Sequence, residues 1–327
     1  MSPDIKRSTI SGQAALWLFL LVAGLVLLLG GCSASPQTQS SSNTPSEQVA
    51  AAEMDDSNES SEVDVENRVI FSTRGDMPIP DNNTVEGYDV TGDNNPDTLT
   101  FTIDGASQDY ATGFSIDVNG KQAYRIDDSF YPGAVVVEYL RTKNNQCFLF
   151  VQLSSDDGDG VNVLLQDQDG SFRTLLNEDS LPVSAGTHHG IKSITAKEDL
   201  LSVEYDQMTF AVGYMTMTFD YQALDRGGIE LMSDETTQIS YANGTSSLVS
   251  AGNFEVFETT DLARKAFDVT KGETVSIAAA AMLNDSLYLM IKNGSGETGW
   301  IKAPTQLVPE SQSSAGRTMF EGTGLAG

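Results

Sequence analysis

An alternation of apolar and polar residues with a period of two runs through the middle of this 327-residue chain and limits its fold to β structure. In 98–103 Leu, Phe and Ile alternate with Thr, and in 214–221 Met, Phe and Tyr alternate with Tyr, Thr and Asp. Successive side chains of a strand point to opposite faces, so each pattern predicts a strand with one buried face. No long segment has a helical period, and the pattern leaves room only for a short helical turn near 261–265.

Turn-forming residues separate several of the apolar runs. Asn119-Gly120 and Asp169-Gly170 each lie between two such runs, and both pairs tolerate the positive φ angles of a two-residue hairpin turn. The segment 143–145 predicts a third hairpin in the same way. Regularly spaced strands without crossover helices predict antiparallel sheets, and therefore an all-β fold.

The N-terminus has the pattern of an export signal. Lys6 and Arg7 precede an apolar run over 14–29, which is short for a helix crossing a hydrocarbon core of about 30 Å. The run ends in Leu-Gly-Gly-Cys, which resembles a bacterial lipobox with Cys32 as the residue that receives a diacylglyceryl group. The resemblance implies a lipoprotein that begins at Cys32 and is held at the cell membrane, outside the cytoplasm, by acyl chains. An uncleaved anchor helix is the alternative.

Composition restricts the partners of the chain. It has 46 acidic and 18 basic residues and a formal net charge of −28, which repels phosphate backbones, so we expect no nucleic-acid partner. Cys147 is the only other cysteine. Lipidation of Cys32 would leave it unpaired, and its apolar neighbours predict a small buried hydrophobe rather than a reactive thiol.

Shifts in composition predict five parts. Residues 32–66 are rich in Ser, Gln, Asn and acid and cannot bury enough apolar surface to fold. A polar break at 241–246 separates two strand-rich blocks. We expect a signal peptide at 1–31, a disordered tether at 32–66, an antiparallel β domain at 67–243, a small barrel at 244–308 and a flexible tail at 309–327.

The block after the break resembles a bacterial Src-homology-3-like domain. The resemblance lies in Lys-Gly-Glu-Thr-Val at 271–275, an aromatic strand at 287–292 and Gly-Glu-Thr-Gly-Trp-Ile at 296–301. It implies a small β-barrel of a kind that often recognises cell-wall peptide or serves as an adhesion module. Trp300 and Tyr288 are the candidate ligand-contacting aromatics, and a core or barrel-edge position is the alternative for Trp300.

An acidic loop at 89–97 is the sharpest candidate for chemistry. Oxygen-bearing side chains fall at alternate positions, the spacing with which a chain folds around calcium, a cation that takes six to eight oxygens. The loop resembles those of FG-GAP and related β-propeller repeats, which implies side-chain ligands from Asp89, Thr91, Asp93 and Asp97 and a carbonyl ligand from Asn95. With one good copy a full propeller is not predicted, and 67–243 is either propeller-repeat-like or a sandwich. The alternative for the loop is a metal-free turn whose side chains cap local amides.

The chain has no sequence motif for catalysis. A nucleophile elbow, a zinc-protease helix, a phosphate loop and Cys-His zinc spacing are all missing, and the only two histidines are adjacent at 188–189. We therefore expect no enzyme, but a membrane-anchored surface lipoprotein that binds a cell-wall component or a surface protein. An exported hydrolase without a recognisable motif and a passive structural calcium-binding surface protein are the alternatives.

Overall fold

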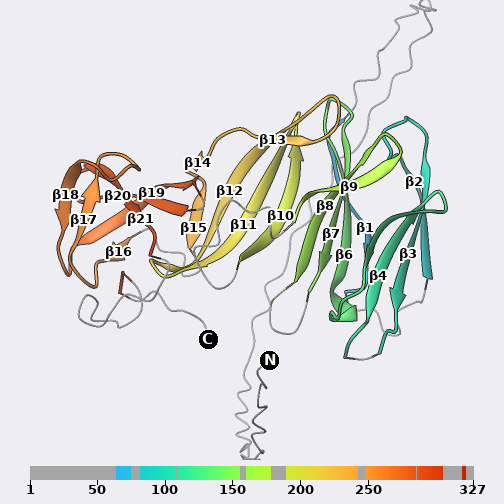
Figure 1. Ribbon diagram of the computed structural model, residues 1–327, viewed down its shortest axis with the longest axis horizontal. Helices are drawn as coiled ribbons and strands as arrows, with labels where there is room; N and C mark the ends of the chain where they lie inside the picture. The colour runs from blue at the N-terminus through green and yellow to red at the C-terminus, as the bar shows by residue number, and fades with distance from the viewer. Residues whose placement is uncertain are drawn as a thin grey trace, which may run out of the picture. The chain divides into compact units, whose positions relative to one another are not determined.

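The computed structural model describes residues 64–74, 82–107, 109–154, 160–177, 189–241, 247–284, 286–304 and 319–321. The predicted signal peptide, Cys32, most of the tether, the break at 242–246 and most of the tail lie outside these residues. Within them every pair of strands is antiparallel and no α-helix occurs, so the all-β prediction is confirmed (Figure 1). In the same residues no helix has the length and apolar character needed to cross a membrane.

Three successive groups of four strands form antiparallel meanders, in which each strand pairs with the next along the chain. The first meander comprises β2 (Asn82–Tyr88), β3 (Asp97–Asp104), β4 (Gly113–Val118) and β5 (Lys121–Ile126). The second comprises β6 (Val135–Arg141), β7 (Cys147–Leu153), β8 (Val161–Gln168) and β9 (Ser171–Leu176), with β1 (Glu66–Ser72) added beside β6 and the short 3-10 helix η1 (Pro132–Ala134) before it. The third comprises β10 (His189–Lys197), β11 (Leu200–Thr209), β12 (Gly213–Ala223) and β13 (Ile229–Leu231), with β15 (Ile239–Tyr241) also paired to β12.

The remaining strands form a fourth sheet with the order β14-β19-β20-β21-β17-β18. Their bounds are β14 Glu235–Thr236, β16 Leu248–Val249, β17 Phe254–Phe257, β18 Lys265–Val269, β19 Thr274–Leu283, β20 Ser286–Lys292 and β21 Thr298–Lys302. Strand β16 pairs with β19, whereas the next strand along the chain, β17, pairs with β21 and β18. In the described strands every sheet is open rather than closed into a barrel.

The sheet of the second meander is buried on both faces, which explains its unbroken apolar run at 147–151. Leu149 and Val151 of β7 pack in one core cluster, which includes residues of the first meander. Phe148 and Phe150 point the other way, into a second cluster that includes residues of the third meander and the C-terminal sheet. A central strand of this kind lacks the polar positions of a half-buried strand.

The predicted hairpin turns are confirmed, and the predicted helical turn is wrong. Asn119 and Gly120 have φ angles of 53° and 76°, and Asp169 and Gly170 have 55° and 77°, as the twist of a two-residue hairpin requires. Near 261–265, Leu262 has a φ of 55°, which a right-handed helix excludes. The chain turns there and enters β18, a strand that sequence reasoning missed.

Candidate functional site

The first and third turns of each meander come together at one end of the sheets, which we call the loop end. Adjacent strands of a meander run in opposite directions, so its first and third turns lie at the same end. The loop end comprises 89–96 and 119–120 from the first meander, 142–146 and 169–170 from the second, and 198–199 and 224–228 from the third. The acidic loop is the longest of these turns and leads directly into β3.

Hydrogen bonds join the loop end of the first meander to that of the second. Asn145 donates from its side-chain amide to Oδ1 of Asn94, at 3.1 Å. On the other side, the Lys121 ammonium donates to the carbonyl of Gly170. Both contacts link equivalent parts of the two meanders. The bond between Asn145 and Asn94 joins their first turns, and the bond between Lys121 and Gly170 joins their third turns.

The second and third meanders are joined at the same two levels. The backbone N–H of Asn144 donates to Oδ1 of Asp199 at 2.9 Å, which links the first turns. The backbone N–H of Gly228 donates to Oε1 of Gln166 at 2.6 Å, which fixes the third turn of the last meander against β8. The loop end is therefore one hydrogen-bonded surface built from the turns of three meanders.

Asp97 fixes the acidic loop to this surface. Its side chain is buried, with 3% exposed, and Oδ2 accepts the backbone N–H groups of Val90 at 2.8 Å and Thr91 at 2.9 Å. Oδ2 also accepts the Thr91 hydroxyl at 3.1 Å, and Oδ1 accepts the side-chain amide of Asn119 at 2.6 Å. Three of these four donors use Oδ2 and one uses Oδ1, so both oxygens of the carboxylate hold parts of the fold in place.

The other two acids of the loop accept amides within it. The two oxygens of Asp89 accept the N–H groups of Asp93 at 3.0 Å and Asn94 at 2.9 Å. Oδ1 of Asp93 accepts the N–H of Asn95 at 2.8 Å, which leaves Oδ2 without a hydrogen bond to any described residue. No three His, Cys, Asp or Glu side chains gather as a metal-binding group within the described ranges. These contacts match the amide-capping alternative, and calcium binding stays a prediction.

A cavity of about 410 Å³ lies between the acidic loop and the ends of β1, β2 and β6. Arg68 lies over the Tyr88 ring, 5.8 Å from its centroid, and Tyr88 is tilted against Tyr139 at 5.3 Å. Glu66, Glu86, Asp89 and Arg141 also line this cavity. Sequence reasoning missed it, because neither β1 nor β6, which carry Arg68 and Arg141, has an alternating pattern that marks one face.

A second cavity, of about 270 Å³, lies on the other side of the loop, between the third turns of the first two meanders. Its lining includes Lys121, Phe172 and Asp167. Oδ1 of Asp167 is buried and has no hydrogen-bond partner within the described residues. Desolvation raises the pKa of this carboxyl, and the nearby N–H of Gly170 and charge of Lys121 oppose the rise.

Beneath the acidic loop, Tyr139 and Cys147 form a buried polar pair. The Tyr139 hydroxyl lies 3.3 Å from Sγ of Cys147 and 3.2 Å from the carbonyl oxygen of Asp89. Desolvation raises the pKa of the Cys147 thiol to about 11. Cys147 is free and buried, as the sequence predicts, and its raised pKa fits a structural rather than a nucleophilic thiol.

The two candidate aromatics of the C-terminal sheet pack together rather than standing apart in solvent. Trp300 of β21 is 6% exposed and lies in a small cluster with Ala279 and Ala281. Tyr288 of β20 is partly buried against the same cluster. The burial of Trp300 is what the core alternative expects, and neither residue contributes to the loop end.

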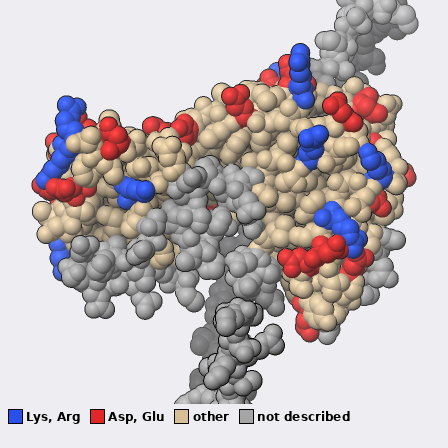
Figure 2. Space-filling model, viewed as in Figure 1, with Lys and Arg blue, Asp and Glu red and all other residues tan. Residues whose placement is uncertain are grey.

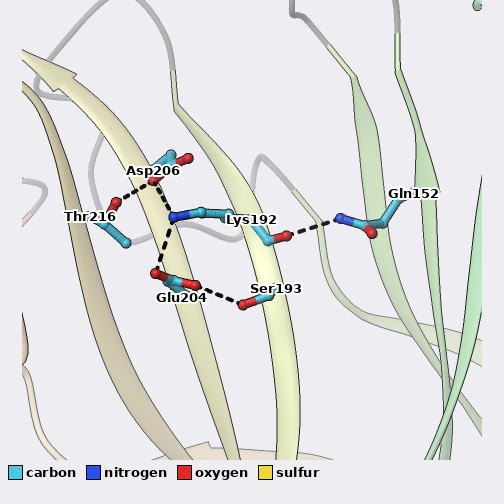
Figure 3. A network of polar contacts seen from close by, with 6 residues as sticks. All are labelled: Gln152, Lys192, Ser193, Glu204, Asp206 and Thr216. Atoms are coloured by element: carbon cyan, nitrogen blue, oxygen red, sulfur yellow. Dashed lines mark hydrogen bonds and ion pairs between the residues drawn. The ribbon is translucent and has the colours of Figure 1, made fainter. Parts of the chain in front are cut away.

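Charged residues on the third meander form ion pairs with one another. The Lys192 ammonium lies 3.3 Å from Glu204 and 3.8 Å from Asp206 on the neighbouring strand, and hydroxyls of Ser193 and Thr216 donate to these carboxylates (Figure 3). Elsewhere, Figure 2 shows acidic side chains lying beside basic ones at several places on the face that it draws. These paired charges do not by themselves indicate a ligand.

The chain matches no protein-family model, no curated protein and no solved structure.

Proposed function

We propose that this chain is an exported lipoprotein, anchored through Cys32, whose β body binds a cell-envelope component or a surface protein through the loop end. The observation that carries the proposal is the hydrogen-bonded loop end itself. Six turns from three units form one surface, and a cavity of about 410 Å³ opens beside its longest loop. Binding residues concentrate on loops that a rigid scaffold positions, and this surface has that organisation. We assign no catalytic step to it.

The repeat interpretation of 67–243 belongs to the same proposal. Three consecutive four-stranded meanders, each hydrogen-bonded to the next through equivalent turns, support a propeller-repeat-like organisation. A four-stranded meander is the unit of a propeller blade. The acidic loop then occupies the first turn of the first unit, and a calcium ion there would be structural.

The strand order of the C-terminal sheet supports the Src-homology-3-like proposal. Strands β19, β20 and β21 form a meander flanked by β16 on one side and β17 on the other, although β16 and β17 follow each other in the chain. A chain segment that pairs on both sides of one meander is the arrangement from which a small sheet could close, although the described strands leave it open. At the Lys-Gly-Glu motif, Gly272 has a φ of 83° and Glu273 accepts the Thr270 N–H at 3.0 Å, which makes the tight turn before β19.

Binding is tested by pull-down of the full-length chain on purified peptidoglycan, with and without chelator. We expect retention of the wild type and its loss in Asn94→Ala/Asn145→Ala, which breaks the first link of the loop end. Arg264→Ala, an exposed change in the turn between β17 and β18, is the control and should bind like wild type. Binding unaffected by the loop-end variant would contradict the proposed surface. Retention after removal of everything beyond Asn243 would place the activity outside the C-terminal sheet.

The anchor is tested by Cys32→Ala. We expect this change to abolish the mass increment of lipidation and to release the chain from the membrane fraction after signal removal. A variant that keeps the same increment and still sediments with membranes would contradict the lipoprotein assignment.

A further inference from the structure

The cavity beside the acidic loop has a lining of mixed charge, most of which is already compensated. Arg68 pairs with Glu66, whose carboxylate lies 3.8 Å away, and its guanidinium also lies over Tyr88. Both carboxylate oxygens of Asp89 accept hydrogen bonds from backbone amides of the loop. These three side chains therefore have partners within the fold.

Two lining side chains of opposite charge remain. Arg141 donates from Nε to Oδ1 of Asn145 at 2.6 Å, and it makes no ion pair with any carboxylate of the described residues. Glu86 likewise has no ion-pair partner within the described ranges. The hydrogen bond to Asn145 holds the guanidinium in place, because Nε is one of five donors on a rigid planar group.

The backbone explains why these two groups face the same space. Arg141 of β6 is directly opposite Glu66 of β1 in the antiparallel register, so both lie at the cavity end of their sheet. On the facing sheet, β2 has a bulge at Gly87, whose φ is 97°, and Glu86 and Tyr88 on either side of it both line the cavity. A bulge re-aims side chains in this way.

We propose that this cavity binds a small zwitterion, an amino acid or short peptide with a free ammonium and a free carboxylate. Arg141 receives the carboxylate, Glu86 receives the ammonium, and Tyr88 contacts the apolar part between them. The cavity volume of about 410 Å³ lies within the usual range for small-ligand sites. The inference rests on the proposed binding role of the loop end and names its ligand class.

Calorimetric titration of the full-length chain with three peptides tests the charge requirement. The probes are alanyl-alanine, its N-acetyl form, which lacks the ammonium, and its C-terminal amide, which lacks the carboxylate. We expect each blocked peptide to bind about tenfold more weakly than alanyl-alanine, since each loses one charge-assisted contact. Equal affinities of the three peptides, or no binding of any, would overturn the proposal.

Two variants assign the charges to residues. Glu86→Gln should weaken the binding of alanyl-alanine about tenfold and leave the binding of the N-acetyl peptide unchanged. Arg141→Gln should weaken the binding of alanyl-alanine about tenfold and leave the binding of the C-terminal amide unchanged. Arg125→Gln on β5, which breaks ion pairs with Asp104 of β3 and with Asp127, is the control and should change nothing. If Arg141→Gln lowers the melting temperature, the comparison of the three peptides on the wild-type chain still tests whether the cavity requires both charges. Loss of peptide discrimination with retained peptidoglycan binding would overturn the ligand class alone.

Discussion

The side-chain amide of Asn67 pairs with both backbone groups of Ala196. Its Nδ2 donates to the Ala196 carbonyl at 3.1 Å, and its Oδ1 accepts the Ala196 N–H at 2.6 Å. Asn67 lies on β1 and Ala196 on β10, so a single side chain makes the two bonds that a neighbouring strand would make. It thereby joins the edges of two different sheets, in addition to the turns of the loop end.

We expect Asn67→Ala to lower the free energy of unfolding by about 2 kcal/mol, because two hydrogen bonds are lost and Ala196 is buried. Asn67→Asp should cost at least as much, since a carboxylate would face the Ala196 carbonyl. Urea unfolding measures both. Asn95→Ala removes an exposed side chain bonded within its own loop, at 3.3 Å to Asp93, and should cost less than about 0.5 kcal/mol. Equal losses at Asn67 and Asn95 would contradict the bridging role.

Such a bridge could not be predicted from the sequence, although the sheets that it joins could. The alternation in 98–103 and 214–221 and the Asn-Gly and Asp-Gly turns are local signals, and local physics decides them. Asn67, by contrast, follows the predicted tether in a short polar strand, and its partner is 129 residues away. Only the packing of the meanders brings the two together.

The cavity residues show the same limit. The sequence of β6 does not alternate, so it does not predict which face Arg141 occupies, and its position opposite Glu66 depends on the register of β1 with β6. Strand β18 was missed for a different reason: only three of its five residues, Ala266, Phe267 and Val269, are apolar, and they do not alternate. The step from the acidic loop into a strand was predicted and is confirmed by β3, whereas the amide caps within the loop were only the alternative to the calcium site.

Asp97→Asn should destabilise the fold by about 2–3 kcal/mol, because an amide cannot accept from all four donors that the carboxylate satisfies. The loss should be the same in calcium and in chelator, since the donors belong to the protein. Asp93→Asn, exposed and bonded only to a loop N–H in the described residues, is the control and should cost less than about 1 kcal/mol in chelator. A loss at Asp97 that appears only with calcium would instead make this carboxylate a metal ligand.

The calcium prediction has its own test at Asp93, whose Oδ2 is not used by a described donor. If the loop holds a structural ion, calcium adds about 2.7 kcal/mol to the free energy of unfolding at a hundredfold excess over Kd. The melting temperature then rises with calcium. We expect Asp93→Ala to remove most of the rise. Diffuse attraction to an acidic surface would survive this change and fade with monovalent salt. Equal calcium responses in wild type and Asp93→Ala would leave only the amide-capping role.

The Cys147 thiol should resist alkylation in the folded chain. Its pKa is raised from 9.0 to about 11 by burial, so at pH 8 its thiolate fraction is roughly a hundredfold below that of an unfolded thiol. Peptide mapping after iodoacetamide treatment, with and without urea, measures the difference. Rapid labelling of the folded chain would contradict the buried position.

The same pKa sets a pH dependence of stability. The folded thiol binds its proton more tightly than the unfolded one, so its contribution is full below about pH 9 and is lost as pH rises through about 11. The difference in free energy of unfolding between wild type and Cys147→Ala should therefore fall between pH 9 and pH 11. A difference that stays constant over this range would show that the thiol does not titrate with folding.

Gly299 marks the closest approach of two strands in the C-terminal sheet. A Cβ atom there would lie 2.6 Å from the Phe257 carbonyl oxygen and 2.8 Å from Cγ1 of Val256, both on β17. Because the nearer atom belongs to the backbone, it cannot turn aside, and β17 and β21 would have to separate. We expect Gly299→Ala to cost about 1–3 kcal/mol through overpacking, and Trp300, the next residue, to become more exposed.

Gly294→Ala is the matched control, since a Cβ atom at Gly294 meets nothing within 4 Å. It should leave stability unchanged or raise it by up to about 1 kcal/mol, because alanine reduces the freedom of the unfolded chain. Thermal unfolding followed by tryptophan fluorescence measures both variants, and Gly299→Ala should show a red-shifted native spectrum as well as a lower melting temperature. Equal melting temperatures for the two variants would mean that β17 and β21 do not pack as closely as Phe257 and Gly299 indicate. Since β17 follows β16 in the chain but pairs on the other side of the β19–β21 meander, loosening this contact should also weaken the pairing on which the Src-homology-3-like proposal depends.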